Sequence, residues 1–439
     1  MNLPPTLLAH LEQAQETLAS IPGLFELYRT CFASTYETTT KLLPGGEAFV
    51  VTGDIPAMWL RDSSAQVRHY LPFAKRDAQL QALLEGLITR QVKYICIDPY
   101  ANAFNEEPDG NRWDEDETFL TPWTWERKYE TDSLCYPVWL AWSYWKATGR
   151  AQVFTPQWRE AARKILATLR TEQNHRERSA YRFIRPWAVE QENARETLQN
   201  GGLGTPVAYT GMTWSGFRPS DDACAYHYLI PANCFVAVIL GYLAEIAQAV
   251  WQDTGFASDA LRTRQEIVRG IEAYGIVHHP RFGRIYAYES DGLGHFRIMD
   301  DANVPSLLSL PYLGYLAPDD PVYQNTRKWI LSEENPCYFS GEAAAGIGSE
   351  HTPKGYIWPI SLAMQGLTAA NPAEKEQMIR LLLDTTAECG RMHESFDADD
   401  PAQFTRPWFA WADSLCAELI YETYLKGTND QGGNGNGLF

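Results

Sequence analysis

The 439-residue sequence alternates between two kinds of segment, and this alternation is the feature that most limits its fold. One kind begins with polar or acidic residues and continues as an apolar stretch rich in aromatic side chains. The other kind is typical of an amphipathic helix. The apolar segments are expected to begin near residues 62, 132, 222, 301, 356 and 409. The amphipathic helices are expected at 78–95, 155–171, 257–275, 321–332 and 373–388, with the helices of 6–40, broken at Pro22 and Gly23, as a sixth.

A helix that is apolar on every side must be buried, whereas an amphipathic helix covers a core with one face. The alternation therefore predicts an all-α fold of six helical hairpins, with apolar helices in an inner ring and amphipathic helices in an outer ring. Small β insertions are expected at 45–54 and 281–297. The acidic residues precede the inner helices, so the six helix entrances are expected to meet on one face.

A single domain is expected to span residues 1–426. The tail of 427–439, rich in Gly and Asn, is expected to be disordered. Two long inserts, 98–131 and 185–219, precede inner helices and are expected to wall one cleft. The chain contains 15 Trp and 23 Tyr, side chains that suit a wet groove because each offers a flat apolar face and a polar edge.

The net charge limits the kinds of binding partner that the protein can have, and the cysteines indicate the cellular compartment in which it works. A net charge of −18 without a basic stripe argues against nucleic acid or an anionic membrane as a partner. No apolar run is expected to span a bilayer, because Glu245 and Gln248 interrupt 235–250, and the N-terminus lacks a signal-peptide pattern. The eight cysteines form no C-x-x-C pair, which predicts buried, reduced thiols and a cytoplasmic protein. Partners in an oligomer are not predicted.

The residues 214–222 (WSGFRPSDD) bring two aromatic side chains, an arginine and two adjacent carboxylates in front of the apolar segment 223–249. One aspartate of the pair is expected to cap that helix, where the dipole stabilises anions. Beside aromatic surface, desolvation can also raise a carboxyl pKa into the range of an acid catalyst. Glu394 lies in a loop that is expected to open on the same face, unless it is an ordinary surface residue. Two facing carboxyl groups are the minimum for glycoside hydrolysis.

Other polar residues at helix entrances carry weaker indications. Arg61 and Asp62 form either an internal ion pair or a fork that grips a sugar diol. His351 is either structural or a hydrogen-bond partner of a sugar hydroxyl. The acidic segments 109–117 and 397–400 resemble a calcium loop only in charge, since the ligand spacing is wrong. No metal site and no cofactor are therefore expected.

Several long motifs, which together reach across nearly the whole chain, resemble those of glycoside hydrolase family 125. These are TGDIPAMWLRDSSAQVR at 52–68, AFNEE at 103–107, KYETDSLCYP at 128–137, TWSGFRPSDDAC at 213–224, MDDANVPSLL at 299–308 and MHESF at 392–396. The family comprises exo-acting α-1,6-mannosidases. The resemblance implies an (α/α)6 barrel and a metal-independent, inverting hydrolase that removes non-reducing terminal mannose from a mannose-containing oligosaccharide.

Onto the matching positions, the resemblance places the general acid at Asp221 or Asp222, with Asp221 favoured, and the general base at Glu394. The residues predicted to bind the terminal sugar are Arg61, Asp62, Trp59, Asn105, Arg218, Asp301 and His351. Two other functions stay open. One is a related barrel glycosidase that acts on other α-glycosides such as α-glucosides, and the other is a non-catalytic carbohydrate-binding protein.

Overall fold

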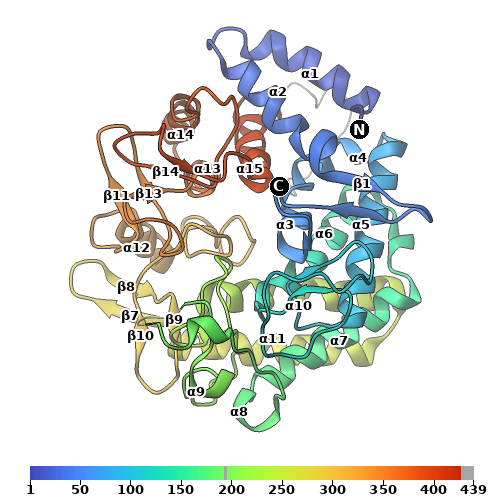
Figure 1. Cartoon of the computed structure of the whole chain (residues 1–439), viewed down its shortest axis with the longest axis vertical. Helices are drawn as coiled ribbons and strands as arrows, with labels where there is room; N and C mark the ends of the chain where they lie inside the picture. The colour runs from blue at the N-terminus through green and yellow to red at the C-terminus, as the bar shows by residue number, and fades with distance from the viewer. Residues whose placement is uncertain (192–194, 427–439) are drawn as a thin grey trace.

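The computed structural model describes residues 1–191 and 195–426, so the predicted disordered tail of 427–439 lies outside the described residues. The described chain is mostly helical and carries small antiparallel sheets (Figure 1). The helices follow one another around the molecule in chain order, and the last of them returns to the first. The predicted combination of helices with small β insertions is confirmed to this extent.

The amphipathic segments form helices close to their predicted bounds. They are α1 (Pro5–Leu18), α2 (Leu24–Ser34), α5 (Ala78–Ile97), α7 (Pro156–Glu172), α11 (Thr254–Tyr274), α12 (Pro321–Ile330) and α14 (Pro372–Asp384). Most begin at a side chain that accepts a hydrogen bond from the first turn, as strong N-cap residues do. These caps are Asp77, Thr155, Asp253, Asp320 and Asn371. Local sequence therefore sets where these helices start.

The buried helices follow a different rule. They are α3 (Leu60–Ala65), α6 (Thr131–Thr148), α10 (Ile230–Ile246), α13 (Pro359–Leu367) and α15 (Ala410–Ile420), and nearly all their residues are buried. Helix α6 packs against α3 and α10, and α15 packs against α13, α3 and α2. Outside them, α11 covers α10 and α14 covers α13. None of these five helices has a side-chain cap in the described structure, so packing positions them.

The predicted inner helix that begins near Asp301 is wrong. Residues 302–316 form bends and turns instead of a helix. Pro305 and Pro311 remove backbone donors from this stretch and disfavour helical backbone at the residues before them. The Asp300 carboxylate accepts hydrogen bonds from the N–H groups of Leu307 and Leu308 at 2.7 and 3.0 Å, which replaces helical bonding there. The turns still pack inward, since Tyr136 of α6 donates a hydrogen bond to the carbonyl of Val304.

The helix expected near Asp222 starts later than predicted. Helix α10 begins at Ile230, after the short strand β6 (Tyr228–Leu229). The aspartates at 221 and 222 therefore do not cap it, and they lie in a closed loop where Phe217 pairs with Ala223. The interpretation of this pair as a helix cap is wrong.

Short strands connect the inserts to the inner helices. Three-stranded sheets are formed by β3 (Met58–Trp59), β4 (Ala103–Phe104) and β5 (Thr124–Glu126), by β6, β9 (Glu289–Ser290) and β10 (Phe296–Arg297), and by β13 (Tyr356–Ile357), β14 (Ser395–Asp397) and β15 (Phe404–Thr405). Two-stranded sheets are formed by β1 (Thr40–Leu42) with β2 (Ala48–Val50), by β7 (Ile276–His279) with β8 (Gly283–Tyr286), and by β11 (Tyr338–Ser340) with β12 (Ala345–Ile347). The predicted hairpin at 281–297 is thus two pairings, β7–β8 and β9–β10.

The remaining helical elements are short. They are the helices α4 (Leu71–Ala74), α8 (His175–Arg178) and α9 (Gln199–Gly202), the 3-10 turns Arg68–Tyr70, Ala151–Val153 and Pro186–Ala188, and the π turns Thr35–Thr39, Ala247–Trp251 and Tyr421–Leu425. Helix α10 and the π turn after it, Ile230–Trp251, are long and apolar enough to cross a membrane, although most of the segment is buried inside the molecule. The expectation that no run reaches this length is wrong, because Glu245 and Gln248 fall near its end.

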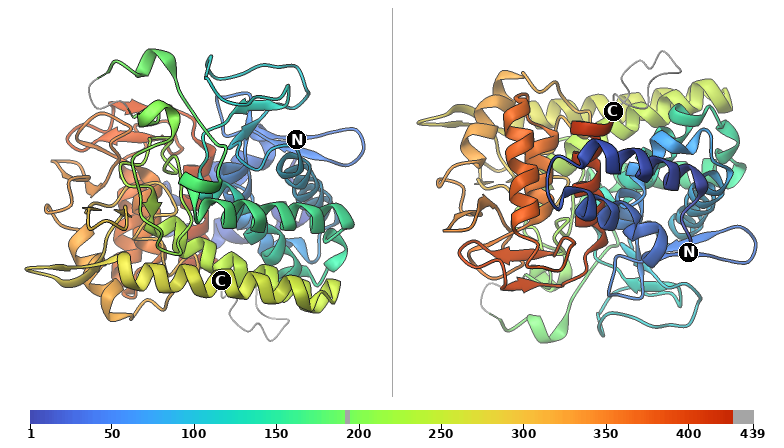
Figure 2. Two further views of the ribbon diagram at one scale, coloured as in Figure 1. Left: turned by 90° about the horizontal axis from the view of Figure 1, so that it is seen from below. Right: turned by 90° about the horizontal axis from the view of Figure 1, so that it is seen from above.

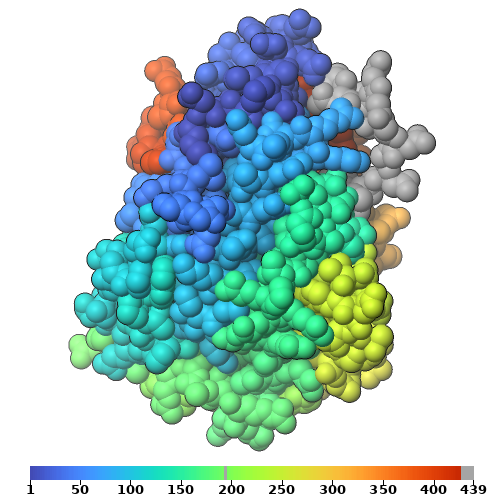
Figure 3. Space-filling view, turned by 90° about the vertical axis from the view of Figure 1, so that its right-hand side faces the viewer, coloured from blue at the N-terminus to red at the C-terminus, as the bar shows by residue number. Residues whose placement is uncertain are grey.

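The two inserts lie on the same side of the helical body. Both views in Figure 2 show the loops around residues 105–125, 180–191 and 195–210 projecting from one face. Figure 3 shows a different face, where α5, α7 and α11 form a continuous surface. An ion pair between Arg159 of α7 and Asp253, the cap of α11, joins two of these helices. Residues of both inserts, among them Trp113 and Glu196, line one cavity on the face from which the inserts project, as predicted from their positions in the chain.

Candidate active site

A cavity of about 200 Å³ opens where the inner-helix entrances meet the inserts. Aromatic side chains form one part of its wall, and they are Trp59, Trp113, Trp358, Phe409 and Trp411. Charged side chains form the other part, and among them are Arg61, Asp62, Lys128, Asp221, His351, Glu394 and Arg406. Trp59, Trp358 and Phe409 are the residues immediately before α3, α13 and α15. The N-terminal ends of three inner helices therefore border the cavity.

Adjacent aspartates in the 217–223 loop point to different partners. Asp221 lines the cavity, and its φ of 68° is left-handed, a conformation that Asp tolerates better than most residues. The loop is held by Lys128, whose Nζ donates to the carbonyl of Asp221 at 2.8 Å. Asp222 is 2% exposed, and its Oδ1 accepts a hydrogen bond from His351 Nδ1 at 3.0 Å. The sharp turn at Asp221 separates one carboxylate that faces the cavity from one that is buried in an ion pair.

The guanidinium of Arg61 organises the acids around Asp221. Arg61 Nη1 lies 2.6 Å from Glu130 Oε2 and 3.2 Å from Asp132 Oδ2. Nε lies 3.5 Å from Asp62 Oδ2, and Nη2 lies 3.9 Å from Asp221 Oδ1. Asp62 and Asp132 belong to the first turns of α3 and α6, and Glu130 directly precedes α6. Two inner-helix entrances thus share one buried cation beside the cavity.

The charges in this cluster separate the pKa values of its carboxyl groups. Burial raises the pKa of Asp221, but Lys128, Arg61 and a hydrogen bond with Glu130 outweigh it, so this pKa lies below its usual value. Burial raises the pKa of Glu130 well above its usual value despite Arg61, and the charges of Asp221 and Asp132 add to the rise. Burial, opposed by Arg61, raises the pKa of Asp132 to about 6. A proton in the cluster is therefore held more firmly by Glu130 than by Asp221.

Glu394 and Arg406 stand at matching ends of two paired strands. Glu394 precedes β14, Arg406 follows β15, and Ser395 pairs with Thr405 between them. The N–H of Glu394 donates to the carbonyl of Arg406, and Arg406 Nη1 lies 3.2 Å from Glu394 Oε1. Arg406 also binds Asp54 through Nε and Nη2. This hairpin places a carboxylate in the cavity and fixes one of its oxygens.

His351 carries a positive charge at neutral pH. Burial lowers its pKa, but the hydrogen bond to Asp222 and the charges of Asp222, Asp221 and Glu394 outweigh this and raise the pKa to about 9. Nδ1 is committed to Asp222. The ring lines the cavity, so Nε2–H is the group that can donate to a bound hydroxyl.

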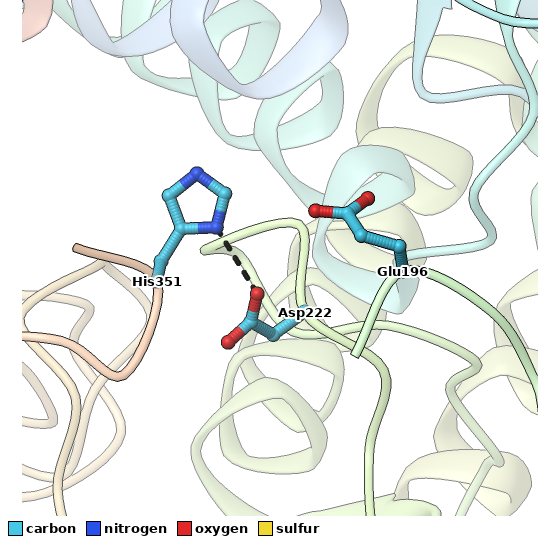
Figure 4. A group of neighbouring side chains, drawn as sticks. All are labelled: Glu196, Asp222 and His351. Atoms are coloured by element: carbon cyan, nitrogen blue, oxygen red, sulfur yellow. Dashed lines mark hydrogen bonds and ion pairs between the residues drawn. The ribbon is translucent and has the colours of Figure 1, made fainter. Parts of the chain in front are cut away.

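Glu196, Asp222 and His351 could in principle hold a metal ion, since their ligand atoms lie within 4.8 Å of one another (Figure 4). Each carboxylate is already neutralised. Lys128 and Arg185 lie 2.8 and 2.6 Å from Glu196 Oε2, and Arg195 lies 3.5 Å from Asp222 Oδ2. A metal-binding imidazole must also be neutral. The cationic surroundings do not fit a divalent cation.

The acidic segment 109–117 uses its carboxylates to join the two inserts. Asp116 binds Arg185 through Nε and Nη2, and Asp114 accepts a hydrogen bond from Trp187 Nε1 at 2.6 Å. In the segment 397–400, Asp397 Oδ1 accepts hydrogen bonds from the N–H groups of Asp399 and Asp400. Asp114, Asp116 and Asp397 are thus engaged by protein donors.

The structure brings together Asp221, Glu394, Arg61, Asp62, Trp59 and His351 in one cavity, and it places four other predicted residues outside the lining. Asp222 pairs with His351 behind the cavity wall. Asn105 is buried, and its side-chain amide donates to the carbonyls of Asn111 and Pro122. Arg218 binds Glu289 at 2.6 Å and Glu350 at 2.9 Å beside a neighbouring cavity. Asp301 accepts hydrogen bonds from Asn303 and Ser349, which flank the site.

Sequence reasoning missed several residues of the site. Glu196 and Arg406 lie in segments without a local signal, and Asn303 and Trp358 line the cavity without having been singled out. In the sequence, Lys128, Glu130 and Asp132 form one of several polar segments that precede an apolar helix, and nothing else distinguishes them. Their alternation in the segment between β5 and the apolar helix α6 is the signal that would have marked them, since charges entering a buried helix require partners.

Comparisons with known proteins agree with this geometry. Residues 22–421 match the model of metal-independent α-mannosidases, glycoside hydrolase family 125. The meiotically up-regulated gene 157 protein of Schizosaccharomyces pombe is 39% identical over 94% of this chain and 86% of its own length. A metal-independent α-mannosidase of Streptococcus pneumoniae, solved in a non-productive complex with α-1,6-mannobiose, is 46% identical with a TM-score of 0.92, over 95% of this chain and 98% of its own. A glycosidase solved with glucose is 16% identical with a TM-score of 0.55, over 92% of this chain and 98% of its own, which shows the fold alone.

Proposed function

Because the chain belongs to glycoside hydrolase family 125, the metal-independent α-mannosidases, we propose that it removes non-reducing terminal α-1,6-linked mannose from an oligosaccharide with inversion of configuration. The observation that carries the proposal is the pair Asp221 and Glu394, which line one small cavity from two separate loops. A compact cavity of this kind suits one sugar residue with the rest of the glycan outside, as an exo-acting enzyme requires. The complex of the Streptococcus pneumoniae enzyme with α-1,6-mannobiose supports the linkage.

In the proposed mechanism the two carboxyl groups act on opposite faces of the mannose ring. Asp221 donates a proton to the glycosidic oxygen, and that oxygen leaves as an alcohol. A water molecule attacks the anomeric carbon from the other face, and Glu394 accepts the proton that the water loses. Inversion requires roughly 6.5–9.5 Å between the two carboxyl groups. Arg61, Asp62, Asn303 and His351 offer the donors and acceptors that hold the sugar hydroxyl groups.

We infer an (α/α)6 barrel from the helix contacts. The apolar helices α3, α6 and α10 contact in succession, as do α13, α15 and α3, and the turns of 302–316 occupy the remaining inner position. One hydrophobic core joins residues from Leu3 to Leu425, which supports a single domain over 1–426. The eight cysteines all lie in the described ranges and are free thiols, six of them buried, which supports the proposed cytoplasmic location. The proposed natural substrate is an N-linked or other mannose-containing glycan.

Removal of divalent cations is expected to leave activity unchanged. The candidate ligands Glu196, Asp222 and His351 are neutralised by protein cations, so no step depends on a metal. Hydrolysis of α-1,6-mannobiose is measured after dialysis against EDTA and again after addition of Ca²⁺ or Zn²⁺. Loss of activity with EDTA and recovery with one of these ions would show that the cluster holds a metal.

Substrate preference tests the proposed function. We expect kcat/KM for α-1,6-mannobiose to exceed that for isomaltose by on the order of 10²-fold or more, because a polar site left with unpaired groups rejects the wrong sugar. α-1,2- and α-1,3-mannobiose are the linkage controls. A preference for isomaltose would identify an α-glucosidase, and binding of mannobiose without hydrolysis would identify a carbohydrate-binding protein.

A further inference from the structure

The cations that face Asp221 create a difficulty for the proposed acid catalyst. A general acid must carry a proton at the working pH, and its ideal pKa lies near that pH. Lys128, Arg61 and His351 face Asp221, and each of them favours the ionised carboxylate. An isolated aspartate in this place would be ionised at neutral pH. The structure must therefore hold the catalytic proton by another means.

Glu130 shares the guanidinium of Arg61 with Asp221 and is buried, with 1% of its surface exposed. Its Oε2 accepts hydrogen bonds from Arg61 Nη1 at 2.6 Å and Ser133 Oγ at 3.0 Å. Its Oε1 is buried and has no N–H or O–H partner among the residues that the structure describes. Asp221 Oδ1 is also buried and has no hydrogen-bond partner among the described residues, and it lies 3.9 Å from Arg61 Nη2. Two buried oxygens without donors thus lie around a single guanidinium.

A hydrogen bond between the two carboxyl groups around Arg61 is the contact that would satisfy both of these oxygens. Two carboxylates have no hydrogen atom to form such a bond, so it requires a proton on one of them. The proton also satisfies both unpartnered oxygens, which would otherwise be costly at this depth.

The charges around the pair lead to the same conclusion. The carboxyl groups of Asp62, Glu130, Asp132 and Asp221 surround one guanidinium, that of Arg61. Lys128 is the next cation, but Glu126 and Glu196 already bind it. His351 is paired with Asp222, and the Cys224 thiol that faces Glu130 is neutral. Four ionised carboxylates would be left without enough positive charge, and one proton relieves the repulsion.

We propose that Glu130 and Asp221 hold one proton between them and that Glu130 is the positioning residue that keeps this proton available for the leaving oxygen. The inference rests on the proposed role of Asp221 as general acid. The resting pair carries one proton and one negative charge. The proton passes to Asp221, whose carboxyl group turns toward the cavity and gives it to the glycosidic oxygen as the C–O bond breaks, and the pair becomes two carboxylates. The repulsion between the two carboxylates raises their proton affinity, so the pair binds a proton from solvent again. Glu394 releases to solvent the proton that it took from water.

Glu130→Gln tests the inference, because the amide keeps the shape but carries no acidic proton and donates a hydrogen bond that stabilises ionised Asp221. We expect kcat/KM for α-1,6-mannobiose at pH 7 to fall by on the order of 10²-fold, the scale of general acid catalysis. The decline of kcat/KM at alkaline pH should begin at a lower pH in this variant than in wild type, so acidification should restore activity. Hydrolysis of 2,4-dinitrophenyl α-mannoside, whose leaving group needs little protonation, should fall by less than about tenfold.

Asp132→Asn is the matched control, since it also removes a buried acid from Arg61 but leaves Glu130 and Asp221 in place. Because the charge of Asp132 contributes to the raised pKa of Glu130, its alkaline loss of activity should move less than that of Glu130→Gln, and at acidic pH both substrates should be affected equally. If Glu130→Gln loses activity equally on both substrates, and its activity declines at the same alkaline pH as that of wild type, Glu130 has a structural role and the inference is overturned. Unchanged activity would overturn it as well. A wild-type protein without mannosidase activity would instead contradict the proposed function.

A second measurement depends neither on activity nor on the folding of a Glu130 variant. In wild-type protein with ¹³C-labelled Asp and Glu carboxyl carbons, two resonances should titrate together in two separate steps, as coupled groups do. Asp221→Asn should abolish the coupling and leave one step. Independent titration of every carboxyl group near Arg61 would overturn the inference.

Discussion

Glu394→Gln is expected to lower kcat on α-1,6-mannobiose by at least about 10²-fold while the affinity for the sugar stays within a few-fold of wild type. The amide is nearly isosteric with the carboxylate, so Arg406 keeps an oxygen acceptor at the position of Oε1. It cannot accept the proton that the attacking water must lose. The measurement is steady-state kinetics together with calorimetric binding of α-1,6-mannobiose.

Asp397→Asn is the control for this variant. It makes the same chemical change in strand β14, but its carboxylate accepts hydrogen bonds from backbone N–H groups outside the cavity. We expect it to retain wild-type kinetics. Azide gives a further test in Glu394→Ala, because an anionic nucleophile needs no base and should yield the β-mannosyl azide. Normal turnover by Glu394→Gln would contradict the assignment.

Asp221→Asn is expected to distinguish the role of Asp221 from that of the adjacent Asp222. Its kcat/KM on α-1,6-mannobiose should fall by about 10²–10⁴-fold, whereas the loss on 2,4-dinitrophenyl α-mannoside should be much smaller. Unlike Glu130→Gln, this variant should not recover on acidification, because the acid itself is gone. Steady-state kinetics on the two substrates across pH measures both effects.

Asp222→Asn should behave differently, because Asp222 pairs with His351 and Arg195 outside the reacting centre. Without this carboxylate the pKa of His351 is expected to fall below its value of about 9, since the hydrogen bond and charge that raise it are lost. Both substrates should then be affected alike, with a larger loss as pH rises through the lowered pKa. The reverse pattern in the two variants would make Asp222 the acid.

Much of the helical framework was predictable because its signals are local. The outer helices combine an apolar face with a cap such as Asp77 or Asp320, and their observed bounds lie within a few residues of the predicted bounds. The inner helices were recognisable from uninterrupted apolar sequence. The exception is 302–316, where Pro305 and Pro311 act against helix formation and the Asp300 carboxylate bonds the backbone instead. An apolar composition alone does not show whether a buried segment is a helix.

The site was predictable only where its residues stand at helix entrances. Arg61, Asp62 and Glu394 could be placed on one face by that reasoning, but the choice between Asp221 and Asp222 depends on a left-handed turn at Asp221. The shared proton depends on contacts between Arg61, Glu130 and Asp221 that are far apart in the sequence. Arg406 reaches Glu394 only through strand pairing. Such long-range contacts have no local sequence pattern.

The configuration of the mannose first released tests the central claim most directly. If Asp221 and Glu394 act as acid and base on opposite faces of the ring, ¹H NMR of α-1,6-mannobiose hydrolysis should show the anomeric signal of β-mannose first. The α anomer should appear later, at the rate of spontaneous mutarotation. Initial release of α-mannose would mean retention, for which the two carboxyl groups should lie roughly 5–5.5 Å apart, and it would contradict the roles assigned to Asp221 and Glu394.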